Sequence, residues 1–299
     1  MAIYTDIDDL DLTQDEKNYF GNANYFTSSG DVMAGVVYER FIYTQYKELN
    51  LVPAGFAPPR AGGHGKDFEF FIRNYNSMIP QNSTSGGMGM NVGVELKLSE
   101  TDDYGQSGVK YDGAWVLHGG MDGVAMEKRK LLKAAGVEQV IRNRWNPKGI
   151  PNIRAGVYST QVSEAKRQED KNKFRSFEYK SNSFVNLCAK YYLSKQCPYI
   201  NISNLGLYHF GTDPAGLAKE FGVKNFTTAV KGMVCRVRLK QSGKNSLTYN
   251  ASLKIDADAG VTASPVNLND DIFAEELQED AMMCTNAPNN LALLRALLP

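Results

Sequence analysis

The chain has 299 residues, of which 42% are hydrophobic and 22% are charged, and these values exclude a protein that is disordered throughout. The net charge is zero, because 33 basic side chains balance 33 acidic ones. The two signs are nevertheless segregated. Residues 1–127 carry a net charge of −10, residues 128–254 one of +17 and residues 255–299 one of −7. A basic middle beside an acidic end predicts a protein that binds a polyanion and competes with itself for it.

Three parts follow from this distribution of charge. We expect an acidic N-terminal region, 1–90, packed on a core, a basic and β-rich core, 91–255, that binds nucleic acid, and an acidic linker and tail, 256–299, with a terminal amphipathic helix. No apolar run approaches the roughly 20 residues needed to cross a bilayer, and the acidic N-terminal segment lacks the order of a signal peptide. We therefore expect a cytoplasmic protein, in the host cytoplasm if it is viral, that has no contact with a membrane.

Periodicity predicts the elements in chain order. Apolar spacing predicts a helix over residues 31–50, and short extended runs predict strands at 67–72 and 92–98. Residues 109–118 are expected to return as the strand paired with 92–98. A helix over 126–135 should end at Gly136, and a short helix should run from Asp213 to Gly222. The clearest pattern is a β-hairpin, 233–240 and 247–255, with one apolar and one cationic-polar face.

Cations alternate with aromatic rings in the basic stretch, which is the mixture that a single nucleic acid strand requires. Lysine and arginine bind phosphates, and exposed rings stack on unpaired bases. The candidate nucleic-acid-binding residues are Arg142, Arg144, Trp145, Arg154, Tyr158, Lys171, Lys173, Arg175, Phe177, Tyr179, Lys180, Tyr192, Lys231, Arg236, Arg238 and Lys240. Other rings are expected to belong to the core, because Phe184, Leu187, Cys188 and Tyr191 fall at helical spacing.

The acidic tail mixes carboxylates with apolar residues after a loose linker, 257–267. Such a segment can occupy a basic groove until nucleic acid displaces it, or it can bind partner proteins of replication or recombination; a merely solubilising charge run is the alternative. The residues assigned to this role are Asp270, Asp271, Phe273, Glu275 and Glu276.

The search for catalytic residues identifies none, and we expect a protein that is not an enzyme and has no cofactor. The three histidines are far apart in sequence, and no nucleophile motif of the Gly-x-Ser-x-Gly kind is present. Cys188, Cys197, His209 and Cys235 are residue types that bind zinc, but they lack the close Cys-x-x-Cys spacing typical of such sites. Whether they bind zinc stays open.

One segment supports a resemblance to a known family. A short helix ending in Gly222-Val223, the pair Lys231-Gly232, the alternating strand 234–240 and the pair Tyr249-Asn250 resemble the closing part of phage-type single-stranded DNA-binding proteins. The resemblance covers residues 217–255. It implies an α+β protein with an OB-like antiparallel β-barrel core, inserted helices and an acidic C-terminal tail that contacts replication proteins. The first 120 residues depart from that pattern, and the tail continues to a leucine-rich end.

Two functions from different classes are compatible with these features. The first is a sequence-nonspecific single-stranded DNA-binding protein, expected to be that of a virus such as a bacteriophage, that coats and protects strands during replication or recombination. The alternative is a virion structural protein, a capsid or tail component, that assembles through its oppositely charged segments. Self-association is compatible with both functions. The sequence does not distinguish DNA from RNA, because no residue is identifiable as a reader of the 2′-hydroxyl.

Overall fold

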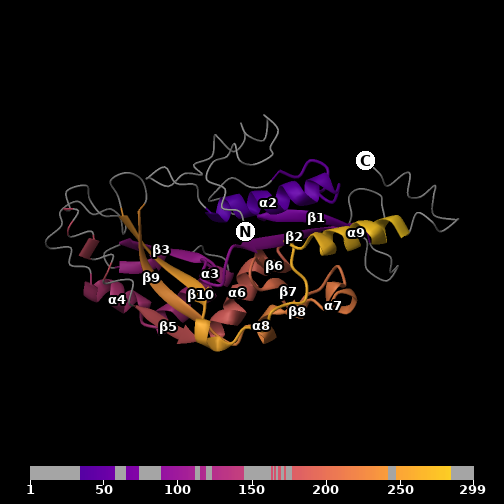
Figure 1. Cartoon of the computed structure of the whole chain (residues 1–299). Coiled ribbons are helices and arrows are strands. Elements are labelled where there is room, and N and C mark those ends of the chain that lie inside the picture. The colour runs from indigo at the N-terminus through magenta and orange to yellow at the C-terminus, as the bar shows by residue number, and fades with distance from the viewer. Residues whose placement is uncertain are drawn as a thin grey trace. The chain divides into compact units, whose positions relative to one another are not determined.

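The chain folds into a mixed α+β protein with two five-stranded sheets (Figure 1). The computed structural model describes residues 34–57, 65–73, 89–111, 115–118, 123–144, 163, 165, 168–169, 172, 177–241 and 247–283. Two compact units divide the chain. The first draws on residues 1–99, 195–226 and 262–299, and the second on residues 100–194 and 227–261. Each unit therefore combines segments that are distant in sequence, whereas the segregation of charge follows the linear chain.

The first unit holds a mixed sheet in the order β1-β2-β6-β7-β8. Its β2 pairs antiparallel with β1 and parallel with β6. Figure 1 shows the helix α2 lying along β1 and β2. The elements of this unit are α2 (Ala34–Glu48), β1 (Phe68–Arg73), β2 (Gly89–Lys97), β6 (Tyr199–Ile202), β7 (Gly206–His209), α7 (Leu217–Glu220), β8 (Lys224–Asn225) and α9 (Asp271–Met283).

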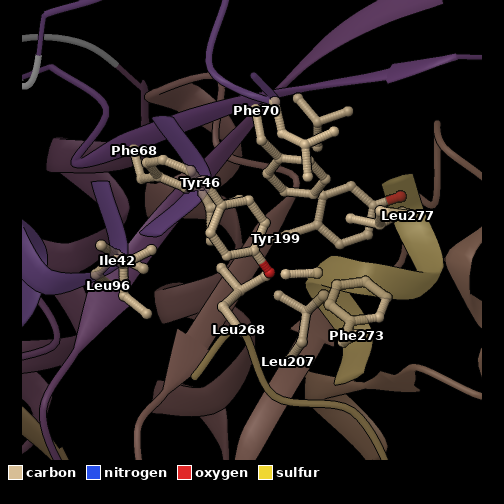
Figure 2. Packing of buried hydrophobic residues seen from close by; sticks show 14 of the residues in the cluster. Ile42, Tyr46, Phe68, Phe70, Leu96, Tyr199, Leu207, Leu268, Phe273 and Leu277 are labelled. Carbon is tan, nitrogen blue, oxygen red and sulfur yellow. The ribbon is translucent and has the colours of Figure 1, made fainter. Parts of the chain in front are cut away.

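The core of the first unit forms where α2 and α9 bury their apolar sides against the sheet (Figure 2). Ile42 and Tyr46, one helical turn apart, are fully buried, and the Tyr46 ring meets Phe68 edge-on with 5.2 Å between ring centroids. Register places Phe68 opposite Val94, so the apolar positions of β1 and β2 share one face. The helical repeat of 3.6 residues in α2 and the strand repeat of 2 residues in β1 and β2 thus direct apolar side chains into one cluster.

The segment before α9, residues 264–267, is hydrogen-bonded to the sheet of this unit. The N–H of Leu207 donates to the carbonyl of Val266 at 2.7 Å, and the N–H of Ser264 donates to the carbonyl of Leu205 at 2.8 Å. Gly206 allows this close approach, since a Cβ there would lie 2.5 Å from the Val266 oxygen. Because of these contacts, residues 264–267 are not the loose linker that the sequence predicted.

The second unit holds an antiparallel sheet in the order β4-β3-β10-β9-β5. Helices α3 and α6 pack together, and α6 contacts β9. The elements of this unit are β3 (Gln106–Tyr111), β4 (Trp115–His118), α3 (Gly123–Ala134), α4 (Val137–Arg144), β5 (Glu178–Ser181), α6 (Ser183–Ser194), β9 (Met233–Gln241), β10 (Leu247–Ile255) and the 3₁₀ helix η3 (Ala257–Ala259); the short α8 (Phe226–Ala229) begins at the boundary of the units.

Several predicted elements are confirmed. The helix α2 and the hairpin of β9 and β10 occur where the periodicity placed them, with Cys235 opposite Leu253. The left-handed Gly136, at φ +77°, follows α3 as predicted. The pairing predicted for residues 109–118 is wrong: they belong to β3 and β4, which pair with each other, and β3 pairs further with β10. The strand β2 instead has β1 and β6 as neighbours, because its apolar face fits that core.

The pairing of the described strands leaves both sheets open, with β1 and β8 as the edges of one and β4 and β5 as the edges of the other. The α+β class is therefore confirmed, whereas barrel closure is not seen among the described strands. None of the described helices is long and apolar enough to cross a membrane.

Candidate functional site

The two faces of the second sheet differ in chemistry. On β9, Met233, Cys235 and Val237 are fully buried on the side toward α3 and α6. Strand alternation directs Arg236 and Arg238 to the opposite side, where their side chains are 23% and 39% exposed. The cationic-polar face predicted for the hairpin is thus present at these two arginines.

Register adds two lysines to the same side. Lys180 of β5 and Lys254 of β10 both lie opposite Val234, which shares its side of β9 with Arg236. We call the side that carries Arg236, Arg238, Lys180 and Lys254 the cationic face. Its lysines have carboxylate partners, since Lys180 bridges Asp256 and Asp258 at 3.0–3.1 Å and Lys254 pairs with Glu178.

The two arginines share one carboxylate. Arg236 Nη2 donates to Asp103 Oδ1 at 2.9 Å, and Arg238 Nη1 donates to Oδ2 of the same side chain at 2.6 Å. Arg236 also donates to the carbonyl of Thr101 at 2.8 Å and to Ser252 Oγ at 3.4 Å. Burial acts to raise the pKa of Asp103, but the two guanidiniums outweigh it and hold the pKa below its ordinary value. The group therefore keeps a net positive charge.

The three predicted rings that the structure describes, Phe177, Tyr179 and Tyr192, lie apart from these cations. Tyr179 is opposite Cys235, on the helix-covered side, and its hydroxyl lies 3.5 Å from the carbonyl oxygen of Gly136. Its neighbour Lys180 projects the other way. Phe177 is half-buried, and Tyr192 is only 1% exposed within α6. A base cannot stack on Tyr192 unless α6 moves, so strand and helix geometry separate rings from charges at these positions.

Much of the predicted basic stretch lies outside the described residues. Lys231 is exposed just before β9. Arg142 and Arg144 belong to α4 and Lys240 to β9 by their backbone, but their side chains lie outside the described part of the structure. The candidates wholly outside the described residues are Trp145, Arg154, Tyr158, Lys171, Lys173 and Arg175.

The acidic tail begins as the helix α9, packed within the first unit. Phe273 is 2% exposed, and its ring meets that of Phe221 edge-on with 5.1 Å between centroids. Ala274 and Leu277 are buried beside it (Figure 2). The four acidic residues of the predicted tail site are exposed, namely Asp270, Asp271, Glu275 and Glu276. Phe273 is thus part of a core while α9 stays packed, and the leucine-rich end lies outside the described residues.

A buried cluster of charges in the first unit was not predicted. Glu95 of β2, with its side chain 5% exposed, accepts hydrogen bonds from Lys97 at 2.6 Å and from Lys195 at 2.8 Å. Asp67 accepts from the N–H of Leu96 at 3.1 Å and lies 3.9 Å from the ammonium of Lys97. The sequence signal was the polar side of an alternating strand, which normally indicates exposure to water. Here both sides of β2 are covered.

The carboxyl groups of this cluster have pKa values shifted in different directions. Burial, with repulsion from Glu95, raises the pKa of Asp67 to about 7. Burial, with repulsion from Asp67, raises the pKa of Glu39 on α2 to about 8. Glu95 itself is buried, but its two lysines lower its pKa below the ordinary value. The cluster can thus exchange protons near neutral pH, although its cations and hydrogen bonds also suit a purely structural role.

The second unit contains an isolated buried amine. Lys128 of α3 is 4% exposed, and its Nζ lies 5.2 Å from the centroid of the Tyr191 ring. Among the described residues this Nζ has no hydrogen-bond acceptor. Burial lowers the pKa of Lys128 to about 8. The nearby thiols of Cys188 and Cys235 are buried, and burial raises the pKa of Cys235 to about 12, so that thiol stays protonated.

The described residues contain no group of three or more His, Cys, Asp or Glu side chains arranged to hold a metal ion. Cys188 and Cys235 belong to the second unit, and Cys197 and His209 to the first. Comparison with protein-family models, with curated protein sequences and with solved structures finds no match to this chain.

Proposed function

We propose that the chain is a non-enzymatic, sequence-nonspecific single-stranded DNA-binding protein that coats strands during viral replication or recombination. The observation that carries the proposal is the cationic face, on which Arg236 and Arg238 project from adjacent same-side positions of one strand and share a single carboxylate. A pair of arginines with a net positive charge on a partly exposed surface suits a phosphate, because each guanidinium can donate two parallel hydrogen bonds to phosphate oxygens.

The basic stretch supports the same function. Residues 128–254 carry a net charge of +17, and the cationic face supplies four of these cations. In the proposal, the rings and cations of residues 142–175 complete the interface by stacking on bases and neutralising further phosphates. The proposal includes an OB-type barrel, in which β9 and β10 are two of the strands.

Salt dependence tests the proposal. Binding of a fluorescent oligo(dT) is measured by anisotropy at a series of NaCl concentrations, with duplex DNA of the same length as competitor. Each phosphate contact on a single strand contributes about 0.7 to the slope of log K against log salt. The double variant Arg236→Gln/Arg238→Gln removes one phosphate site and should therefore lower the slope by about 0.7.

The control variant Lys47→Ala/Lys219→Ala removes two cations from the first unit. Its slope should lie within about 0.3 of the wild-type slope, which is less than the change expected from the loss of one phosphate contact. Circular dichroism verifies the folding of each variant. An equal slope for the wild type and the arginine variant would remove the cationic face from the interface. If the wild-type protein shows no preference for single strands over duplex, the function is wrong.

A specific observation favours the second candidate, a virion structural protein. Ile272 on α9 is 69% exposed and Phe41 on α2 is 37% exposed. Gln45, one turn after Phe41, donates to Asp271 at 2.7 Å, so these two apolar side chains flank one helix contact. Electron microscopy and light scattering of the protein without DNA decide between the candidates: ordered tubes or shells support assembly, and small dispersed species support strand binding.

A further inference from the structure

The two arginines of the cationic face are already occupied in the free protein. Asp103 presents one carboxylate oxygen to each guanidinium, at 2.9 and 2.6 Å. This is the arrangement in which a phosphate would offer two of its oxygens to a pair of arginines. The carboxylate is a smaller anion with one negative charge, so two guanidiniums exceed it in charge and in donors. Arg238 remains 39% exposed.

The segment that carries Asp103 is fixed without help from its carboxylate. The N–H of Tyr104 donates to the carbonyl of Leu253 at 2.8 Å, and the N–H of Ile255 donates to the carbonyl of Glu100 at 3.1 Å. Arg236 contributes its bond to the carbonyl of Thr101. These backbone contacts hold the segment beside β10, so its position does not depend on the contact between the carboxylate and the arginines.

Building on the proposed function, we propose that Asp103 is an internal competitor for the phosphate site, whose carboxylate occupies Arg236 and Arg238 in the free protein and exchanges with the DNA backbone on binding. The contact keeps both guanidiniums in place for a phosphate. Because an anion must displace the carboxylate, a higher concentration of that anion is needed to occupy the site. A polymeric strand, which contacts many cations at once, overcomes this competition more readily than a small anion does.

The variant Asp103→Asn tests the competition, because it keeps the side-chain shape and removes the charge. Its matched control is Asp102→Asn, which removes the same charge one residue away. At low salt, Asp103→Asn should bind oligo(dT) about threefold to tenfold more tightly than the wild type, with a smaller gain at high salt. Asp102→Asn should change the affinity less than about twofold. Equal gains for both variants would mean that only net charge matters, and would overturn the proposal.

A second readout keeps the test valid even if strands do not bind. The Nε–H signals of Arg236 and Arg238 are followed by nuclear magnetic resonance while inorganic pyrophosphate is added. In Asp103→Asn these signals should shift at a lower pyrophosphate concentration than in the wild type. A shift with pyrophosphate but no binding of oligo(dT) by any variant would reject the proposed function and retain the competition. Identical titrations of the two proteins would reject the competition.

The wild-type protein gives an independent measurement that does not depend on a variant folding. The carboxyl ¹³C signal of Asp103 should move when oligo(dT) saturates the protein, since the carboxylate exchanges its guanidinium partners for water. Saturation with no change in that signal would show that the carboxylate stays in place, and would overturn the proposal.

Discussion

Asn201 on β6 accepts a hydrogen bond from the main-chain N–H of Leu268 at 3.0 Å, across 67 positions of the chain. The same amide donates to Tyr38 on α2 and, at 3.1 Å, to Asn267. Asn201 is fully buried. One side chain thus links the sheet, the first helix and the segment that leads to α9.

Replacing this amide should destabilise the first unit. Asn201→Leu keeps the branching of the side chain but leaves the Leu268 N–H without its acceptor and the Tyr38 hydroxyl without its amide donor. This costs about 2–4 kcal/mol in the free energy of unfolding. Guanidinium denaturation followed by circular dichroism measures the loss. Asn186→Ala, at an exposed position of α6, is the control and should change stability by less than about 0.5 kcal/mol. A loss equal to that of the control would contradict a structural role for the network.

The buried cluster should make stability fall as pH rises through neutrality. Asp67 and Glu39 have pKa values raised to about 7 and about 8, so each binds its proton more tightly in the folded state than in the unfolded chain. The unfolding free energy should therefore decrease between about pH 5 and pH 8, by on the order of 1–2 kcal/mol. The lowered pKa of Glu95 acts in the opposite direction, and its stabilisation is lost only at more acidic pH.

The double variant Glu39→Gln/Asp67→Asn should flatten this dependence, because neither position can then release a proton. Denaturation at pH 5.5, 7 and 8.5 measures the difference between wild type and variant, in which the titration of other groups cancels. Glu48→Gln, at an exposed position of α2, should preserve the wild-type slope. If the double variant retains that slope too, the two acids are ionised throughout the range.

Lys128 should destabilise the second unit when it is charged. Lys128→Met removes a buried ammonium that has no described acceptor, and should raise the unfolding free energy at pH 7 by about 1–3 kcal/mol. Because burial lowers the pKa of this amine to about 8, the wild type should regain stability as pH rises from 8 toward 10.5, and the advantage of the variant should shrink. Thermal denaturation at pH 7 and pH 10 measures both effects, with Lys130→Met on the exposed side of α3 as control. Lower stability of Lys128→Met at pH 7 would refute this interpretation.

The sequence predicts elements well where one periodic pattern spans the whole element. The helix α2 and the hairpin of β9 and β10 are such cases. The strands β6 and β7 were not predicted, because each has four residues and a buried Asn201 interrupts the apolar pattern. The partner of β2 was mispredicted because the nearest extended segment was assumed to pair with it, whereas the apolar face of β2 selects β1 and β6.

In the candidate site, too, local patterns predict some features and only the tertiary fold decides others. Alternation alone places Arg236 and Arg238 on one side of β9. Their partner Asp103 is 133 and 135 positions away, and nothing local distinguishes it from other acids of the chain. Tyr192 lies in a basic, aromatic stretch, yet helical packing of α6 buries it. Composition indicates which chemistry is present, and only the tertiary fold decides which groups meet.

The interleaving of segments has a consequence for how this protein is made. During translation, β1 and β2 emerge well before Leu268 and Phe273, which complete their core. The nascent chain thus carries an unfinished apolar surface until that later segment has been synthesised. For the same reason, deleting residues 256–299 to remove their negative charge would also remove core residues of the first unit. Replacing the exposed acids of α9 by amides removes the charge and leaves the core intact.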